Sequence, residues 1–327
     1  MIDSLQRNIE YVRISVTDRC NMRCMYCMPK EGTKWLPHDE ILSYDEILRV
    51  CRILAELGIS KVKLTGGEPL VRKHLDQLVR DIKQIDGIDN VTLTTNGLLL
   101  SEQLPALAAA GIDAINISID SFEPEIFKRI TGTDAVEKVR QAIEDVTKYD
   151  HIRVKINCVP MRSINDAGLA EIAEIARNHR ISVRFIEMMP IGLGAAFEPY
   201  TEDDLKALLE SRFGKMTPFL GKMGNGPCKY YTLEGFQGKI GFISAVSHKF
   251  CEECNRVRLT STGFLKACLQ YDIGTQLKPM LRGGASDEAL KKVIRETIYK
   301  KPKSHSFGEA GTMTNEFDKN KMFQIGG

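Results

Sequence analysis

Two groups of closely spaced cysteines are the residues of this 327-residue chain most suited to chemistry. The first cysteine group consists of Cys20, Cys24 and Cys27, and the second cysteine group consists of Cys251, Cys254 and Cys268. Three thiolates this close together can bind three irons of a [4Fe–4S] cube and leave the fourth iron without a protein ligand. Such an open position is typical of a metal centre that binds a reactant.

Zinc is the alternative for both groups. His38 can complete a four-ligand zinc site with the first group, and either His248 or Cys228 can do so with the second. A pair of guanidinium groups favours a substrate site at the second group. Arg256 and Arg258 project to one side of an extended segment directly after its second cysteine, and guanidinium groups suit phosphate oxygens.

The elements that must position these groups alternate over roughly the first 190 residues between β-branched runs and amphipathic segments. Strands are predicted at residues 11–17, 61–65, 91–95, 114–119, 152–159 and 182–188, and helices between them include residues 44–57, 75–85, 102–110 and 166–178. Six β–α units in a row predict a parallel sheet with right-handed crossovers, forming an incomplete (β/α)6 barrel of the α/β class.

The predicted strands alternate apolar and polar residues, although a parallel strand covered on both faces should be apolar throughout. Each strand therefore has one polar face, which we expect to line the barrel in place of the usual apolar filling. The expected interior cations are Arg13, Lys61, Lys63 and Lys155, which suit a multiply charged anion. An antiparallel sheet with one wet face also alternates, but the intervening helical segments argue against it.

The pattern changes near residue 217, where Gly and Pro become frequent and short strands replace the β–α rhythm. We predict two domains, residues 1–218 and residues 219–327, with the second covering the barrel mouth, where the strands end. A formal net charge of +2 gives no general attraction to nucleic acid or an anionic membrane. Because no signal-peptide pattern or membrane-spanning apolar run is present, a cytoplasmic protein is expected.

The first cysteine group resembles the cluster-binding signature of the radical S-adenosylmethionine (SAM) superfamily, and the turn Gly66-Gly67-Glu68-Pro69 resembles its SAM-binding turn. This resemblance implies that the open iron chelates SAM and that one electron cleaves SAM to methionine and a 5′-deoxyadenosyl radical. The positions that match the superfamily's SAM contacts are Tyr26, Gly67, Glu68, Ser118 and Met189.

Nearly the whole chain is similar to the GTP 3′,8-cyclase family of molybdenum cofactor biosynthesis. The resemblance rests on residues 13–21, 64–69, 94–97, 116–120, 184–190, 226–231, 251–268, 301–307 and 326–327. It implies that the radical removes hydrogen from C3′ of GTP, which then cyclises onto guanine C8, with a second [4Fe–4S] cluster holding the purine. The positions that match the family's GTP contacts are Arg13, Lys61, Lys63, Thr94, Lys155, Arg184, Arg256, Val257 and Arg258.

The same resemblance implies partners and a role for the chain end. A flavodoxin or ferredoxin would supply electrons, a cyclic pyranopterin monophosphate synthase would take the product, and we allow for a homodimer. The family's similar diglycine is associated with its active site, so Gly326 and Gly327 are predicted to be catalytic. The family usually has Arg at the position of Lys63, so this chain keeps the charge there and loses the guanidinium fork.

Two other functions fit parts of the pattern. A radical SAM peptide-modifying enzyme also carries C-terminal cysteines, but it would need more of them and would have little use for interior cations. A non-enzymatic iron–sulfur or zinc protein would want four protein ligands for each metal centre, and each group has three. Cys51 and Cys158 are interpreted as small core residues, and the sequence gives no role for Trp35.

Overall fold

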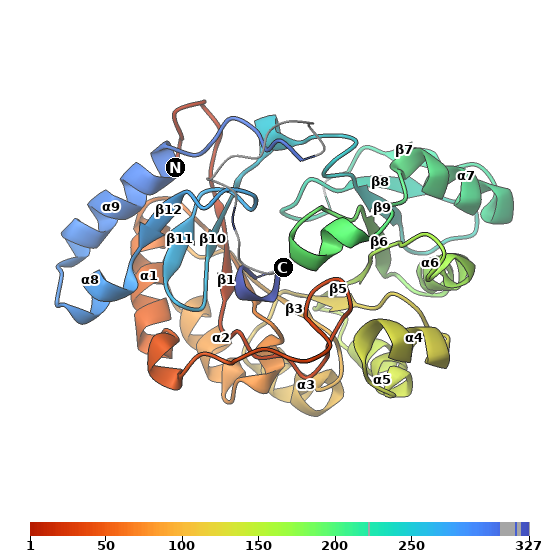
Figure 1. Ribbon diagram of the computed structural model, residues 1–327, viewed down its shortest axis with the longest axis horizontal. Helices are drawn as coiled ribbons and strands as arrows, with labels where there is room; N and C mark the ends of the chain where they lie inside the picture. The colour runs from red at the N-terminus through yellow and green to blue at the C-terminus, as the bar shows by residue number, and fades with distance from the viewer. Residues whose placement is uncertain (222, 308–317, 319–321, 327) are drawn as a thin grey trace.

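The computed structural model describes residues 1–221, 223–307, 318 and 322–326. Their strands form one continuous twelve-stranded sheet in the order β12-β11-β10-β1-β2-β3-β4-β5-β6-β9-β8-β7. The sheet curves, and its helices cover the outer side (Figure 1). The predicted α/β architecture with a partial parallel barrel is confirmed.

The barrel strands lie where the alternation predicts them. They are β1 (Tyr11–Ser15), β2 (Lys61–Thr65), β3 (Asn90–Thr95), β4 (Ala114–Ser118), β5 (Arg153–Cys158) and β6 (Ser182–Ile186). Each pairs in parallel with the next, so the antiparallel alternative is wrong. The helices that follow them are α1 (Tyr44–Glu56), α2 (Leu75–Lys83), α3 (Leu100–Ala109), α4 (Pro124–Thr131), α5 (Val136–Val146), α6 (Leu169–Asn178) and α7 (Glu202–Phe213).

Helix α1 shows how the sequence builds the outer layer. Ser43 and Glu46 form a capping box, in which each side chain accepts a hydrogen bond from the other residue's backbone N–H, so two N–H groups at the helix start are satisfied. Ile47, Val50 and Leu54 recur at helical spacing, are buried, and pack in the core with the apolar faces of the strands. The polar faces of the strands therefore point away from the helices.

The strands after β6 extend the same sheet at both edges. β9 (Ile240–Ile243) pairs in parallel with β6, and β10 (Arg256–Leu259) pairs in parallel with β1. The antiparallel strands are β7 (Thr217–Phe219) and β8 (Lys229–Thr232) beyond β9, and β11 (Phe264–Lys266) and β12 (Gly274–Gln276) beyond β10. Helices α8 (Lys278–Arg282) and α9 (Asp287–Tyr299) follow β12. The boundary between residues 218 and 219 stays a prediction.

The direction of β10 decides where the second cysteine group lies. Tyr11 at the start of β1 is opposite Arg256 at the start of β10, so the cysteines that precede β10 lie where the barrel strands begin. The first group follows β1 and lies where the strands end. Five residues of strand separate the beginning of the strands from their end by roughly 16 Å. The parallel pairing therefore places the second cysteine group where the barrel strands begin, opposite the first group. That the second domain covers the barrel mouth stays a prediction.

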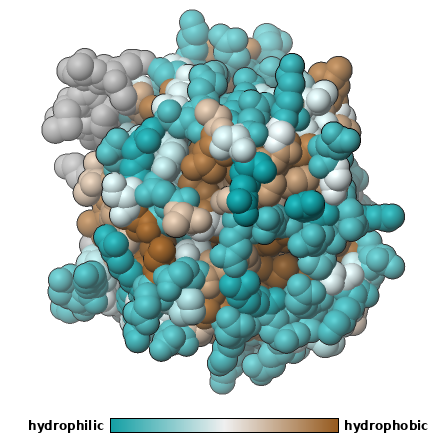
Figure 2. Space-filling model, turned by 90° about the vertical axis from the view of Figure 1, so that its right-hand side faces the viewer, coloured by the Kyte–Doolittle hydropathy of each residue, from teal (hydrophilic) through white to brown (hydrophobic). Residues whose placement is uncertain are grey.

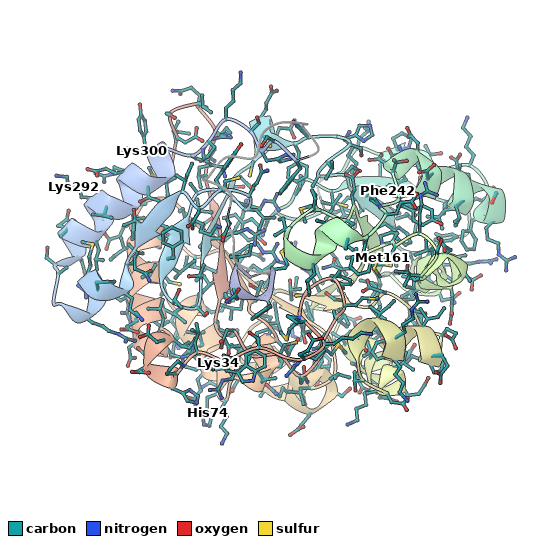
Figure 3. The ribbon with its side chains drawn as sticks, viewed as in Figure 1. Lys34, His74, Met161, Phe242, Lys292 and Lys300 are labelled. Atoms are coloured by element: carbon teal, nitrogen blue, oxygen red, sulfur yellow. The ribbon has the colours of Figure 1, made fainter. Side chains whose placement is uncertain are left out.

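The outer surface is largely hydrophilic on the side that carries α7, β7 and β8, with apolar side chains gathered in hollows between hydrophilic ones (Figure 2). Phe242 of β9 and Met161 lie inside the molecule, whereas Lys292 on α9 and Lys300 directly after it lie at the outer surface (Figure 3). Among the described residues, no helix has the length and apolar character needed to cross a membrane.

Candidate active site

A cavity of about 380 Å³ lies on the polar side of the parallel strands. Both cysteine groups line it, the first where the barrel strands end and the second where they begin. The remaining cysteines, Cys51, Cys158 and Cys228, do not. Cys51 and Cys158 are fully buried in the hydrophobic core, as the sequence predicts. The structure therefore brings the six predicted cluster ligands into one space.

Most of the other predicted site residues also line this cavity. From the SAM set these are Tyr26, Gly67, Glu68, Ser118 and Met189. From the GTP set they are Arg13, Lys63, Thr94, Lys155, Arg184, Arg256 and Arg258.

Strand register places the cations next to one another. Arg13 of β1 lies opposite Lys63 of β2 on one side and Arg258 of β10 on the other. Burial is the main reason why the pKa of Lys63 lies well below its usual value, and the positive charges of Arg184 and Arg13 lower it further. Burial and the neighbouring Arg13 likewise lower the pKa of Arg258. A multiply charged anion in this space would raise the pKa values of both Lys63 and Arg258 again.

Two predicted GTP contacts lie away from the cavity wall. Lys61 points to the same face of β2 as Lys63, but it lies two residues earlier, at the start of the strand, and forms an ion pair with Glu10. Val257 lies between Arg256 and Arg258 and has the opposite parity, so its side chain is buried in the hydrophobic core. The structure brings neither side chain to the other site residues.

Two glycines allow the turn after β2 to pack against the chain that leads into the first cysteine group. A Cβ atom on Gly66 would lie 2.7 Å from the carbonyl oxygen of Thr17, and one on Gly67 would lie 2.4 Å from that of Arg19. Two backbone hydrogen bonds fix this contact, from Gly67 N to Thr17 O at 2.9 Å and from Glu68 N to Arg19 O at 2.8 Å. The glycines are therefore required by the packing of the cysteine loop itself.

Glu68 is 1% exposed and is held by its own chain. Its carboxylate accepts hydrogen bonds from Leu70 N at 3.0 Å, Thr95 Oγ1 at 2.8 Å and Asn96 N at 2.7 Å. Burial raises the pKa of Glu68 to about 7 despite these donors. A carboxylate has about four acceptor positions, so Glu68 keeps room for one more donor from the cavity.

Comparisons with known proteins identify the family of this chain. The Radical SAM superfamily matches residues 14–176, and Molybdenum Cofactor Synthesis C matches residues 181–307. A GTP 3′,8-cyclase of Syntrophomonas wolfei is 45% identical over 330 residues, and one of Clostridium perfringens strain SM101 is 41% identical over 327 residues; 100% of each chain is covered in both cases. This chain belongs to the GTP 3′,8-cyclase family.

A solved structure supports the fold of this family member independently. Streptococcus suis SuiB bound to precursor peptide SuiA has a TM-score of 0.62 to this chain at 14% sequence identity. The likeness covers 91% of this chain and 66% of SuiB. At this identity it bears on the fold alone.

The three thiols of each cysteine group are ligands that suit the iron–sulfur clusters of the GTP 3′,8-cyclase family. In the part of the chain that the structure describes, no three His, Cys, Asp or Glu side chains converge as a single metal ion requires. His248 instead lies 3.8 Å from the Glu202 carboxylate. Although burial alone would raise it, the charges of Lys301 and Arg256 hold the pKa of Cys254 at about 7. This thiol therefore readily supplies the thiolate that binds iron.

The described end of the chain reaches the cavity through Met322 and Phe323. The short η6 turn (Met322–Gln324) lies at the centre of the view beside β1 (Figure 1), and its Phe323 lines the cavity. Gly326 has a φ of +73°, and a Cβ there would lie 2.7 Å from Thr65 Oγ1, so glycine suits this position. Arg258 Nη1 donates to the Gly326 carbonyl at 2.6 Å. Gly327 lies outside the described residues.

The role of Trp35, which the sequence left open, follows from its contacts. Its ring meets the ring of Phe323 edge-on, with centroids 6.3 Å apart, and the Arg23 guanidinium lies over it at 5.0 Å. Trp35 therefore joins the tail to the loop of the first cysteine group. In the sequence, its place shortly after that group is the only signal.

Sequence reasoning also missed two side chains that position predicted site residues. Asp120 accepts hydrogen bonds from Tyr26 Oη and from Val159 N, both at 2.7 Å. Asn157 accepts one from Arg184 Nε at 3.0 Å. Both follow the parity of the polar strand faces, and that signal could have found them.

Proposed function

We propose that the cavity binds one [4Fe–4S] cluster at each cysteine group, with SAM at the first cluster and GTP between SAM and the second cluster. The chain is a radical SAM GTP 3′,8-cyclase of molybdenum cofactor biosynthesis. One observation carries the proposed arrangement: two three-cysteine groups line opposite ends of a cavity whose middle is lined by strand cations.

The first cysteine group and the residues around it form the proposed SAM end. When the cluster and SAM are bound, they supply the 5′-deoxyadenosyl radical that the cyclisation needs. Glu68 offers its free acceptor position to the SAM ammonium, and Asp120 orients the Tyr26 hydroxyl in the cavity wall. Ser118 and Met189 complete the wall on the same side.

The strand cations form the proposed GTP end. Arg13, Lys63, Lys155, Arg256 and Arg258 supply the positive charge for a triphosphate, and guanidinium forks can bind two phosphate oxygens each. Asn157 accepts hydrogen bonds from both Nε and Nη2 of Arg184 and so orients its guanidinium. Thr94 lines the cavity between the two ends. GTP held by these groups would present its ribose toward SAM and its base toward the second cluster.

Other partners follow from this chemistry. Reduction of the first cluster requires a one-electron donor, for which a flavodoxin or ferredoxin is proposed. A cyclic pyranopterin monophosphate synthase would consume the cyclised nucleotide. A homodimer and a cytoplasmic location stay predictions.

Metal analysis tests the arrangement. Anaerobically prepared protein should contain about eight irons per chain, at four per cube. Replacing the three cysteines of the second group by Ala should leave about four irons and preserve cleavage of SAM to 5′-deoxyadenosine. Stoichiometric zinc that persists through anaerobic iron reconstitution would contradict the second-cluster assignment.

A further inference from the structure

A buried arginine near the N-terminus makes contacts that neither the fold nor the proposed chemistry explains. The side chain of Arg7 is 5% exposed and pairs with the fully buried Asp3 through Nε at 2.6 Å. Asp3 also accepts hydrogen bonds from the backbone N–H groups of Leu5 and Arg7, both at 2.9 Å. Between them Gln6 has a φ of +62°, an uncommon conformation for a residue with a side chain. The chain thus adopts a constrained turn that aims Arg7 inward.

The remaining four N–H groups of Arg7 all donate to carbonyl oxygens more than 240 residues away in sequence. Nη1 donates to Cys251 O at 3.0 Å and to Lys303 O at 3.1 Å. Nη2 donates to Lys301 O at 3.0 Å and to Pro302 O at 2.8 Å. A guanidinium has five donors, and Asp3 takes the fifth. Arg7 therefore joins the start of the second cysteine group to residues 301–303.

Lys301 continues this connection to the other two cysteines of the group. It is 4% exposed, and its Nζ donates to Arg256 O at 2.8 Å and to Ala267 O at 2.5 Å. Arg256 follows Cys254 by two residues, and Ala267 directly precedes Cys268. Because each of the three cysteines is held at its own carbonyl or within two residues of it, the two cations fix their relative positions.

We propose that Arg7 and Lys301 are positioning residues that assemble the binding site of the second cluster. This inference rests on the proposed function, which places that cluster at Cys251, Cys254 and Cys268. Arg7 is required as arginine, because lysine has three donors and lacks the planar fork that reaches four carbonyls. The two buried positive charges also favour the negative charge of a thiolate-ligated cluster.

Iron content and SAM cleavage, measured together in the full-length protein, test this inference. Arg7→Met and Lys301→Met should each lower iron from about eight to about four per chain. They should also remove the second cluster's contribution to the electron paramagnetic resonance spectrum. Cleavage of SAM to 5′-deoxyadenosine should persist, because the first cluster lies at the opposite end of the barrel strands from the second. Arg7→Lys should lose at least half of the second cluster's iron.

Arg49→Met is the matched control. Arg49 also joins distant parts of the chain, through an ion pair to Asp287 at 2.7 Å and a hydrogen bond to Ala285 O at 2.5 Å. It is not among the residues that line the cavity. This variant should keep about eight irons. Equal iron loss in Arg49→Met and Arg7→Met would overturn the inference, because the effect would then be general destabilisation.

Two further outcomes separate this inference from the proposed function. Wild-type protein with about four irons would contradict the second-cluster assignment itself. Wild-type protein with about eight irons, together with a folded Arg7→Met that also keeps eight and an unchanged spectrum, would overturn the positioning role alone. If Arg7→Met does not fold, Arg7→Lys decides, and full iron in that variant would overturn the role.

Discussion

Lys155 is expected to take up a proton when GTP binds. Burial first, and then the positive charge of Arg184, lower the pKa of Lys155 to about 7. In the ligand-free protein about half of this side chain is therefore charged at pH 7 and about a tenth at pH 8. A bound triphosphate favours the charged form and restores a pKa well above 8. Binding should then take up about 0.5 proton at Lys155 at pH 7 and about 0.9 at pH 8.

Isothermal titration calorimetry in two buffers of different ionisation enthalpy measures this uptake directly. GTP also titrates near neutral pH, so the decisive quantity is the difference between wild type and Lys155→Met at the same pH. Lys292→Met, on the exposed side of α9, is the control and should match wild type. Equal proton uptake by wild type and Lys155→Met at pH 8 would refute the reasoning.

The lowered pKa of Lys155 also predicts how the stability of the ligand-free protein depends on pH. Because the folded pKa of Lys155 lies below the unfolded value of 10.5, the unfolded chain binds more protons between about pH 7 and 10.5. Stability should rise with pH across this window, by up to about 1.4 kcal/mol per pH unit from this group. Urea unfolding at pH 7 and pH 9 should show a smaller rise for Lys155→Met than for wild type, because Lys63, whose pKa is also lowered, still contributes.

Three further substitutions test the site. Arg256→Ala should weaken GTP binding by roughly 2–5 kcal/mol, as for a desolvated charge contact, and leave SAM binding unchanged by calorimetry; equal loss of both ligands would indicate a damaged fold. Deletion of Gly326 and Gly327 should preserve iron content and GTP binding but sharply reduce cyclised product, whereas full activity would exclude a catalytic tail. Trp35→Ala should loosen the tail by about 0.5–1.5 kcal/mol and lower product formation about two- to tenfold, whereas Trp35→Phe should retain most activity.

The sequence predicted the barrel and much of the site because both depend on a local signal. Val62 and Leu64 alternate with Lys63, so one pattern shows that β2 is a strand, which face meets the helices and which face carries charge. The same parity assigns Arg13 and Lys155 to the polar interior, and both line the cavity. Local alternation is reliable here because each strand has neighbours on both sides and a single buried apolar face.

What the sequence could not give depends on how distant segments pair. β10 has four residues, and nothing in them specifies that it joins β1 in parallel, so the sequence does not show at which end of the barrel strands the second cysteine group lies. Alternation also does not show which residues along a polar strand face reach the cavity. Lys61 and Lys63 have the same parity, but only Lys63 lines the cavity. Arg7 belongs to no periodic pattern, and four of its side-chain hydrogen bonds reach segments that only the folded chain brings close to it.

Arg258 shows why the tail and the substrate are expected to act together. This buried guanidinium lines the cavity among the cations proposed to bind the triphosphate, and its Nη1 also donates to the carbonyl of Gly326. A guanidinium has five donors, so Arg258 can hold the tail and a phosphate at the same time. Loss of the tail would free a donor without removing the charge. Binding of the triphosphate should therefore survive deletion of the diglycine, while the alignment of the tail with the reacting ribose is lost.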